Sequence, residues 1–435
     1  MSHSLNDDVH CPAAPLTKPH PKGKTIAAIT IGNGLEFYDF TIFSFFATII
    51  GKHFFPAESS GTSLLMAFAT YGVGFIFRPL GSMYLGQYAD KYGRKAALTL
   101  TLWLMAIGSA IFVLAPTYQS IGIYAPALIV IARLLQGFAI GGELGASTSY
   151  LMEFATKNSR GYYSSWQFFS QGLSVLMGAL VGLGLTALLT NNQLNEWGWR
   201  VPFIIGLLVI PVGQYIRNTL PEQHAPLKEH SSLWTMAVRH KVSLCAGILI
   251  SIGGTSANYV VLHYMANYAI SQLNIGMVNG IFLGCVAGFI QICFCGLAGK
   301  MCDQFGYKKM VLITRILMLI AIYPAFLLIE AIPIAPVMAG VIILLTILLI
   351  FNTVPSLVLL GIIFPREFRA TGLSLTYSVS TVIFGGFAQF FCSLMIKMTG
   401  SNSAPAIYIF VCGIVSLQGL LLAKEMNSKV ISSLF

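Results

Sequence analysis

The sequence predicts an all-α integral membrane protein with twelve transmembrane helices in two halves of six. Of its 435 residues, 56% are hydrophobic and only 9% are charged, against about 25% charged in an average soluble domain. Long apolar stretches recur along the chain, and a loop motif of the first half returns in the second. Such a composition excludes an ordinary soluble enzyme, a disordered protein and a nucleic-acid binder that works by neutralising phosphates.

Twelve stretches are long and apolar enough to cross a bilayer as helices, which takes about 20 residues each. They show no alternating ten-residue pattern, so helices are favoured over barrel strands. In chain order they are Thr25–Ile50, Ser63–Leu85, Ala96–Ala115, Ile121–Thr148, Ser165–Leu189, Val201–Ile216, Val242–Ile270, Met277–Ala298, Met310–Ile329, Pro336–Ile363, Gly372–Ile396 and Pro405–Ala423.

The polar segments between these stretches predict the domain organisation. Residues 217–241 form the longest break and predict a cytoplasmic linker between six-helix bundles at 25–216 and 242–423. Residues 1–24 predict a cytoplasmic tail rather than a signal peptide, because the apolar stretch that follows is too long and contains acids. Residues 424–435 predict a second, short cytoplasmic tail. With both termini cytoplasmic, that side holds 19 of the 25 basic residues, which agrees with the positive-inside rule.

A repeated loop supports the division into halves. Residues 86–95 read Gly-Gln-Tyr-Ala-Asp-Lys-Tyr-Gly-Arg-Lys, and residues 299–308, 213 positions later, read Gly-Lys-Met-Cys-Asp-Gln-Phe-Gly-Tyr-Lys. Gly, Asp, Gly and Lys recur in register. Two fused halves are typical of secondary transporters, whose substrate site lies between the halves near the midplane.

The first loop fits the pattern G-x-x-x-D-(R/K)-x-G-(R/K)-(R/K), and by it the chain resembles the major facilitator superfamily. Segments 32–40 (GNGLEFYDF), 133–143 (RLLQGFAIGGE) and 364–372 (FPREFRATG) further resemble its metabolite:proton symporter family. That family includes citrate, 2-oxoglutarate, shikimate and proline/betaine transporters. Phe37, where Trp is frequent, and Gln389, where Pro is frequent, depart from the pattern and leave the substrate open.

This resemblance implies the twelve-helix fold of the superfamily and transport by alternating access. It also implies that Gly86, Asp90 and Arg94 belong to cytoplasmic gating machinery, which Asp303 matches more weakly in the second copy. The expected location is the bacterial inner membrane. The expected partners are a small organic anion, protons and the lipid bilayer, with no nucleic acid, and the expected state is a monomer.

Six charged residues fall inside the apolar stretches. Facing lipid near the bilayer centre, each would cost at least ~2.5–3.5 kcal/mol, so we expect them to face the bundle interior. Depth along the helices suggests two sets, one with Arg133 and the other with Arg78. The first set is Glu36, Asp39 and Arg133, the second is Arg78 and Glu143, and Arg315 is the sixth residue.

Asp39 and Arg133, with Glu36 close behind, are the predicted proton-coupling residues. If Arg133 approaches Asp39 in one conformation and leaves it in another, the carboxyl alternately releases and takes a proton. A fixed structural pair is the alternative. For Arg78 we weigh anion binding or gating against a structural pairing with Glu143, while Arg315 is expected to extend its charge to the headgroups.

Uncharged polar residues on other helices are further substrate-binding candidates, although interhelical hydrogen bonding explains any one of them equally well. His263 could titrate near neutral pH, but a helix-packing role is favoured for it. Gln291 is in register with Arg78 across the repeat. The candidates are Gln167, Gln171, Asn258, Tyr259, His263, Asn267, Gln291, Asn352 and Tyr377.

These features predict a proton-coupled symporter that imports a small organic anion, most simply a di- or tricarboxylate such as citrate. No P-loop, metal-ligand cluster or catalytic triad is present in the sequence, so we expect neither an enzyme nor a cofactor, and the proton gradient as the driving force. The alternatives are uptake of a zwitterionic osmoprotectant or of shikimate, a drug or metabolite exporter, and a transporter-like sensor.

Overall fold

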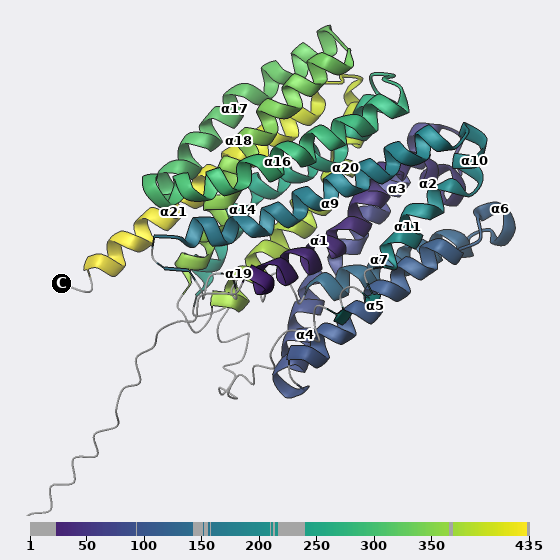
Figure 1. The fold of residues 1–435 in the computed structure, drawn as a ribbon. Helices are drawn as coiled ribbons and strands as arrows, with labels where there is room; N and C mark the ends of the chain where they lie inside the picture. The colour runs from purple at the N-terminus through teal and green to yellow at the C-terminus, as the bar shows by residue number, and fades with distance from the viewer. Residues whose placement is uncertain are drawn as a thin grey trace, which may run out of the picture.

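The computed structural model describes residues 23–92, 94–141, 151, 155–156, 158–208, 210–211, 214–215, 240–364 and 369–432. Within these residues the chain is helical and contains no strand. Figure 1 shows the helices running roughly along one direction, with the purple-to-blue first half beside the green-to-yellow second half.

Helices of the first half coincide with the first six predicted stretches. The bounds are α1 (Gly23–Phe45), α2 (Ala47–Phe54), α3 (Ser60–Ile76), α4 (Arg78–Tyr92), α5 (Arg94–Leu114), α7 (Tyr124–Gly141), α9 (Arg160–Leu188) and α11 (Val201–Gly206). Short helical pieces connect them at α6 (Tyr118–Ile121), α10 (Asn191–Glu196) and η1 (Gly198–Arg200).

The second half begins after the undescribed part of the predicted linker. Its elements are α14 (Lys241–Asn258), η2 (Tyr259–Tyr264), α15 (Met265–Ser271), α16 (Met277–Phe305), α17 (Tyr307–Ala331), α18 (Ala335–Ile363), α19 (Arg369–Ser380), η4 (Thr381–Gly386), α20 (Ala388–Thr399) and α21 (Ala404–Ser432). The last helix runs to Ser432, so most of the stretch predicted as a tail continues the helix.

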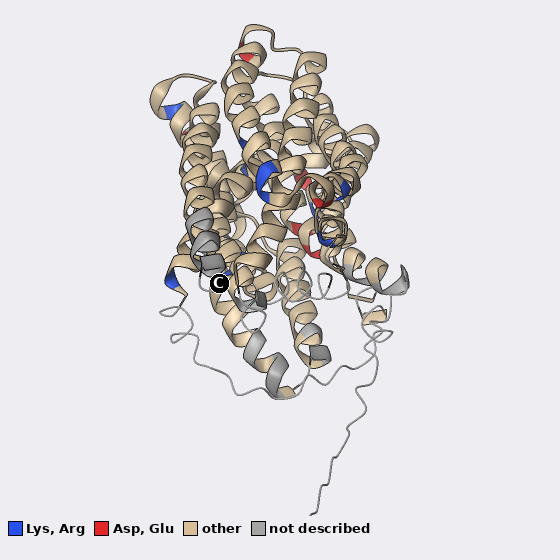
Figure 2. Cartoon of the chain, turned by 90° about the vertical axis from the view of Figure 1, so that its left-hand side faces the viewer, with Lys and Arg blue, Asp and Glu red and all other residues tan. Residues whose placement is uncertain are grey.

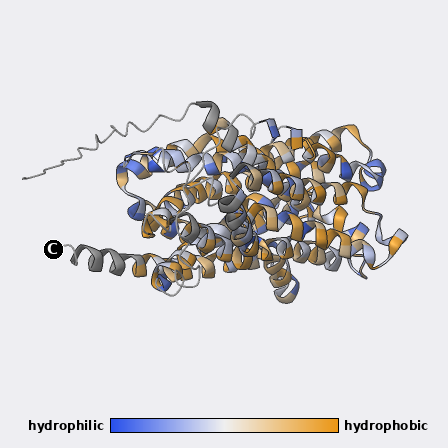
Figure 3. Cartoon of the chain, turned by 90° about the horizontal axis from the view of Figure 1, so that it is seen from below, coloured by the Kyte–Doolittle hydropathy of each residue, from blue (hydrophilic) through white to orange (hydrophobic). Residues whose placement is uncertain are grey.

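Most of these helices are suited to a bilayer. Of the described residues, nine helices are long and apolar enough to span one, and the bent pair α1–α2 would make ten. Helix α5, whose apolar part Thr99–Leu114 is shorter, and α11, whose continuation is only partly described, complete the predicted twelve. Charged residues are sparse on the helices (Figure 2), and hydrophobic residues predominate along them (Figure 3).

Several spans are interrupted midway. The chain bends by 67° between Thr30–Phe45 and Ala47–Phe54, and Tyr259, 213 positions after Phe46, begins the π-helix η2. A second π-helix, η4, interrupts the eleventh span. Because π-helical turns break the regular hydrogen-bond ladder, they are frequent at functional sites. Both adjoin the polar residues described below.

The two halves contact each other closely along α9 and α16. Glycine allows this approach, since a Cβ on Gly288 would lie 2.6 Å from the backbone nitrogen of Leu176 and 2.9 Å from the carbonyl oxygen of Gly172. Small residues at helix contacts are the usual basis of tight packing in membranes.

We expect Gly288→Ala to lower the thermal midpoint of the purified protein by a few degrees. The added methyl would meet backbone atoms, and overpacking of this kind costs about 1–3 kcal/mol. Gly296→Ala on the same helix is the matched control, because a Cβ there meets no atom within 4 Å. Equal midpoints for the two variants would contradict the proposed packing.

Candidate functional site

Asp39 lies at the centre of a buried polar network in the first half. Its side chain is 2% exposed, and Oδ2 accepts hydrogen bonds from Ser109 Oγ and, at 3.0 Å, from Gln136 Nε2. Oδ1 has no hydrogen-bond partner among the described residues, and it lies against Gly206, where a Cβ would collide with it. The carboxylate is therefore half satisfied and closely enclosed.

Arg133 joins this network through an amide. Its Nη1 donates to Gln136 Oε1 at 2.9 Å, and its Nη2 donates to the backbone oxygen of Asp39 at 3.4 Å. The guanidinium carbon lies over the rings of Phe40, Phe43 and Phe112, at 4.8, 4.0 and 4.7 Å from their centroids. Asp39 and Arg133 therefore lie close together, as their similar depths along their helices predicted, and Gln136 bridges the two side chains.

Arg78 is a second buried guanidinium, at the start of α4 just after the helix break at Phe77. It is 2% exposed, and its Nε and Nη2 have no hydrogen-bond partner among the described residues. Its carbon lies over Phe75, Phe40 and Phe37, at 4.3, 5.7 and 5.9 Å from the ring centroids. A cation with free donors, surrounded by aromatic rings, is suited to a ligand carboxylate.

Two tyrosines of the second half reach this guanidinium. The hydroxyl of Tyr259, on η2, approaches Arg78. Tyr377, on α19, lies close enough to interact electrostatically with Arg78, and its hydroxyl approaches Gln171 and Thr381. The structure therefore brings together four of the predicted residues: Arg78, Gln171, Tyr259 and Tyr377.

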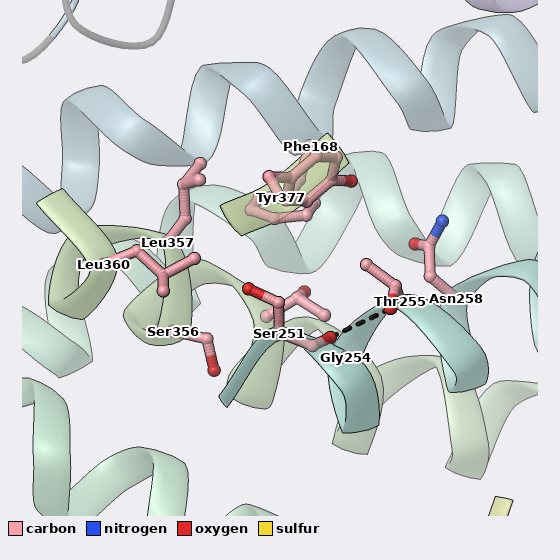
Figure 4. A pocket seen from close by; sticks show the side chains of 10 residues that line it. Phe168, Ser251, Gly254, Thr255, Asn258, Ser356, Leu357, Leu360 and Tyr377 are labelled. Carbon is pink, nitrogen blue, oxygen red and sulfur yellow. Dashed lines mark hydrogen bonds between the residues drawn. The ribbon is translucent and has the colours of Figure 1, made fainter. Parts of the chain in front are cut away.

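Tyr377 also lines a small pocket between α14, α18, α19 and α9. Figure 4 shows its side chains converging from these helices. The lining residues are Phe168, Ser251, Gly254, Thr255, Asn258, Thr353, Ser356, Leu357, Leu360 and Tyr377. Arg78 and this pocket, linked by Tyr377, form the candidate substrate site.

Neutral side chains connect the halves on the far side of the site. Ser44 Oγ lies 3.0 Å from both the backbone oxygen of His263 and Gln389 Oε1, and either oxygen can accept its one proton. Asn267 Nδ2 donates to the backbone oxygen of Ser44 at 2.5 Å. The imidazole of His263 stacks on Tyr259, with centroids 5.4 Å apart, so this predicted residue and Asn267 lie at the contact between halves.

Asp303 connects the halves at the opposite end. Its Oδ1 accepts from the backbone N–H of Gly161 at 2.7 Å, and its Oδ2 accepts from the N–H of Tyr162 at 3.0 Å. These amides begin α9 and have no partner within the helix, so the carboxylate caps the helix and complements its dipole. We call this contact the Asp303 cap.

Other predicted residues serve helix contacts in this conformation. Gln167 Nε2 donates to Asn33 Oδ1 at 3.1 Å, and Gln291 Nε2 donates to the backbone oxygen of Phe168 at 2.9 Å. Glu36 is 2% exposed on α1. Asn352 accepts from Arg315 Nη2 at 2.6 Å and donates to Val311 and Thr314, so its amide is fully engaged away from the pocket.

The prediction that Arg315 extends to the headgroups is wrong. Its side chain is 2% exposed, and it donates to Ser416 Oγ as well as to Asn352. Gly253 on α14 leaves room for the guanidinium, since a Cβ there would collide with it. The side chain therefore lies on the inner face of α17, where polar groups of two other helices receive it.

Some predicted residues lie outside what the structure describes. Glu143 is among them, so its pairing with Arg78 remains a prediction. Gly86 and Asp90 belong to the backbone of α4 and Arg94 begins α5, but their side chains lie outside the described part.

Sequence reasoning missed Ser109 and Gln136, the partners of Asp39, and the hydroxyl residues of the pocket. A signal for the latter was present, because Ser251, Thr255 and Asn258 follow the i, i+4, i+7 spacing of one helix face. No comparable signal identifies Ser109, whose role depends on the packing of α5 against its neighbours.

A membrane bundle of two halves, with buried charges and a pocket between them, defines a multi-pass membrane transporter. The model of the Major Facilitator Superfamily matches residues 29–388, and the chain belongs to this family. It is 34% identical over 399 residues to the citrate-proton symporter of Klebsiella pneumoniae, covering 90% of each chain. It is 31% identical over 425 residues to the glycine betaine/proline/ectoine/pipecolic acid transporter OusA of Dickeya dadantii, covering 93% of this chain and 84% of that one.

Among solved structures, the chain resembles the crystal structure of a D-xylose-proton symporter, with a TM-score of 0.73 and 19% identity. The match covers 92% of this chain and 97% of the other. At this identity the likeness concerns the fold alone, and it agrees with the predicted twelve-helix superfamily fold.

We expect Asp303→Asn to loosen the contact between Gly161 and the end of α16. The amide keeps the shape of the side chain but loses the charge that complements the helix terminus. Cys302 is fully buried beside Gly161. In a background where all other cysteines are replaced, we expect Cys302 to react several-fold faster with N-ethylmaleimide when Asp303 is changed to Asn. Glu330→Gln, an exposed acid at the other end of α17, is the control. If the Cys302 reaction rate is unchanged by Asp303→Asn, the Asp303 cap does not hold the end of α16 against α9.

Proposed function

We propose that this transporter is a proton-coupled symporter that imports a small organic anion by alternating access, most simply a di- or tricarboxylate such as citrate. One observation carries the proposal: Arg78, buried between the halves near the pocket residue Tyr377, keeps two guanidinium nitrogens without hydrogen-bond partners among the described residues. A buried cation with unpaired donors is costly, and an anionic ligand would reduce that cost.

Proton coupling is assigned to Asp39, with Arg133 and Glu36. One oxygen of the Asp39 carboxylate accepts hydrogen bonds and the other has no partner among the described residues, and the carboxylate reaches Arg133 through Gln136 rather than directly. A shift of the amide or of α11 would change how strongly the carboxyl holds a proton. No cofactor is required, because the proton gradient supplies the energy.

The names of the relatives support a proton-coupled transporter of a carboxylate, and they also suggest a second candidate substrate. One is named a citrate-proton symporter, and another a transporter of glycine betaine and proline. Either class of substrate offers a carboxylate to Arg78. Neither relative is named an exporter or a sensor, so export and sensing are less well supported. Both termini are expected on the cytoplasmic side of the bacterial inner membrane.

Asp39→Asn should abolish uphill accumulation while counterflow of unlabelled against labelled substrate continues. Asn keeps the hydrogen bonds with Ser109 and Gln136 but cannot carry a proton. Proteoliposomes with an imposed pH gradient measure accumulation, and the same vesicles without a gradient measure counterflow. Glu58→Gln, an exposed acid between α2 and α3, serves as the control. Full accumulation by Asp39→Asn would remove this residue from the mechanism.

Arg78→Lys should raise the KM for a carboxylate substrate about tenfold to a hundredfold. Lys keeps the charge but not the bidentate geometry, and charge-assisted hydrogen bonds contribute about 1.5–3 kcal/mol. The measurement is counterflow with citrate, tricarballylate, succinate, 2-oxoglutarate, shikimate and betaine. If no carboxylate is transported by the unsubstituted protein at acidic outside pH, the proposed function fails. Saturable accumulation of betaine alone would favour the osmoprotectant candidate.

A further inference from the structure

One side of the pocket consists of hydroxyl groups whose protons are already used. Each of these side chains donates to the backbone carbonyl oxygen four residues earlier in its own helix, at 2.7–2.9 Å. The residues are Ser251 and Thr255 on α14 and Thr353 and Ser356 on α18. Figure 4 draws one of these bonds, from Thr255 to the backbone of Ser251.

A hydroxyl has one proton and two acceptor lone pairs. Once the proton is donated to the helix, the group can offer only lone pairs to a ligand. Asn258, from the same face of α14, is 6% exposed, and its Oδ1 has no partner among the described residues. The NH₂ group of the same amide can donate, so Asn258 is not restricted to accepting. Together the hydroxyl oxygens of Ser251, Thr255, Thr353 and Ser356 and the Oδ1 of Asn258 form what we call the acceptor wall.

The remainder of the pocket is largely apolar. Phe168, Leu357 and Leu360 also line the pocket, and among the described residues that line it there is no Lys, Arg, His, Asp or Glu. Arg78 is not among the lining residues, but it lies close enough to one of them, Tyr377, to interact with it electrostatically. The site therefore offers one cation at one end and neutral acceptors at the other.

We propose that the substrate is carried as a singly charged acid, with one carboxylate on Arg78 and neutral hydrogen-bond donors on the acceptor wall. The donors are hydroxyl groups or carboxyl groups in their un-ionised form. A second carboxylate would face lone pairs in a poorly solvated space and be repelled. This inference rests on the proposed function and defines its substrate class.

Paired competitors in counterflow test the ligand side of the proposal. The full-length protein in proteoliposomes exchanges labelled citrate at several pH values, equal on both faces of the vesicle. Unlabelled shikimate, a hydroxylated ring monocarboxylate, is compared with cyclohexanecarboxylate, which lacks the hydroxyls. We expect shikimate to compete at least tenfold better. The KM for total citrate should rise as pH rises, and become constant when expressed as the concentration of the singly charged form.

Substitutions in the acceptor wall test the protein side. Thr255→Val and Ser356→Ala remove an acceptor with little change of shape, and each should weaken competition by shikimate about three- to tenfold, the effect of one lost hydrogen bond. Competition by cyclohexanecarboxylate should stay the same. The ratio of the two competitors within one variant does not depend on how much protein is folded. Thr346→Val, a buried residue of α18 that does not line the pocket, is the matched control.

The outcomes separate the two proposals. If citrate is transported with a KM that is constant for its fully ionised form, and if the variants leave the competitor ratio unchanged, the singly charged substrate is refuted while the proposed function stands. If no carboxylate competes or exchanges at any pH, the proposed function itself fails. A loss of the shikimate preference in Thr255→Val but not in Thr346→Val supports the acceptor wall.

Discussion

The cost of placing a guanidinium inside an apolar bundle determines much of this structure. Three arginines are almost completely buried, at 2%, 0% and 2% exposure for Arg78, Arg133 and Arg315. Each would be strongly unfavourable alone, and the chain treats them differently. Arg133 is compensated by Gln136 and Asp39, and Arg315 by Asn352 and Ser416. Among the described residues, Arg78 has aromatic faces and two nitrogens without partners, against one each for Arg133 and Arg315, so its environment is the one completed best by a ligand.

The charged and the neutral groups of the site lie in different halves. Asp39, Arg133 and Arg78 all belong to the first half, whereas the second half contributes neutral groups to the pocket, with hydroxyls bonded to their own helices. The far-side contacts of Ser44 with the backbone oxygen of His263 and with Gln389 are neutral as well. Neutral hydrogen bonds contribute only about 0.5–1.5 kcal/mol each. Such contacts can therefore be exchanged for others without a large penalty, as alternating access requires.

The sequence predicted the fold well because its signals are physical requirements. Length and hydropathy gave the twelve spans, and the repeat at 213 positions indicated two related halves. The positions of Asp39 and Arg133 along their helices correctly predicted that the two residues lie close together. The same reasoning failed for Arg315, because depth does not say which face of a helix a residue occupies. That face depends on Gly253, Asn352 and Ser416, which are distant in the sequence. The role of Ser109 depends on the same kind of packing.

Phe40 provides a physical link between the proposed proton site and the proposed substrate site. Its ring lies 4.8 Å from the guanidinium carbon of Arg133 and 5.7 Å from that of Arg78, and it follows Asp39 directly in α1. A carboxylate that binds Arg78 competes with the aromatic faces for the cation, since charge-assisted hydrogen bonds are stronger than contacts with a ring. Because Phe40 contacts Arg78 and directly follows Asp39, a displacement of Arg78 would also move the backbone beside Asp39. Substrate and proton sites can thus remain separate groups and still depend on each other.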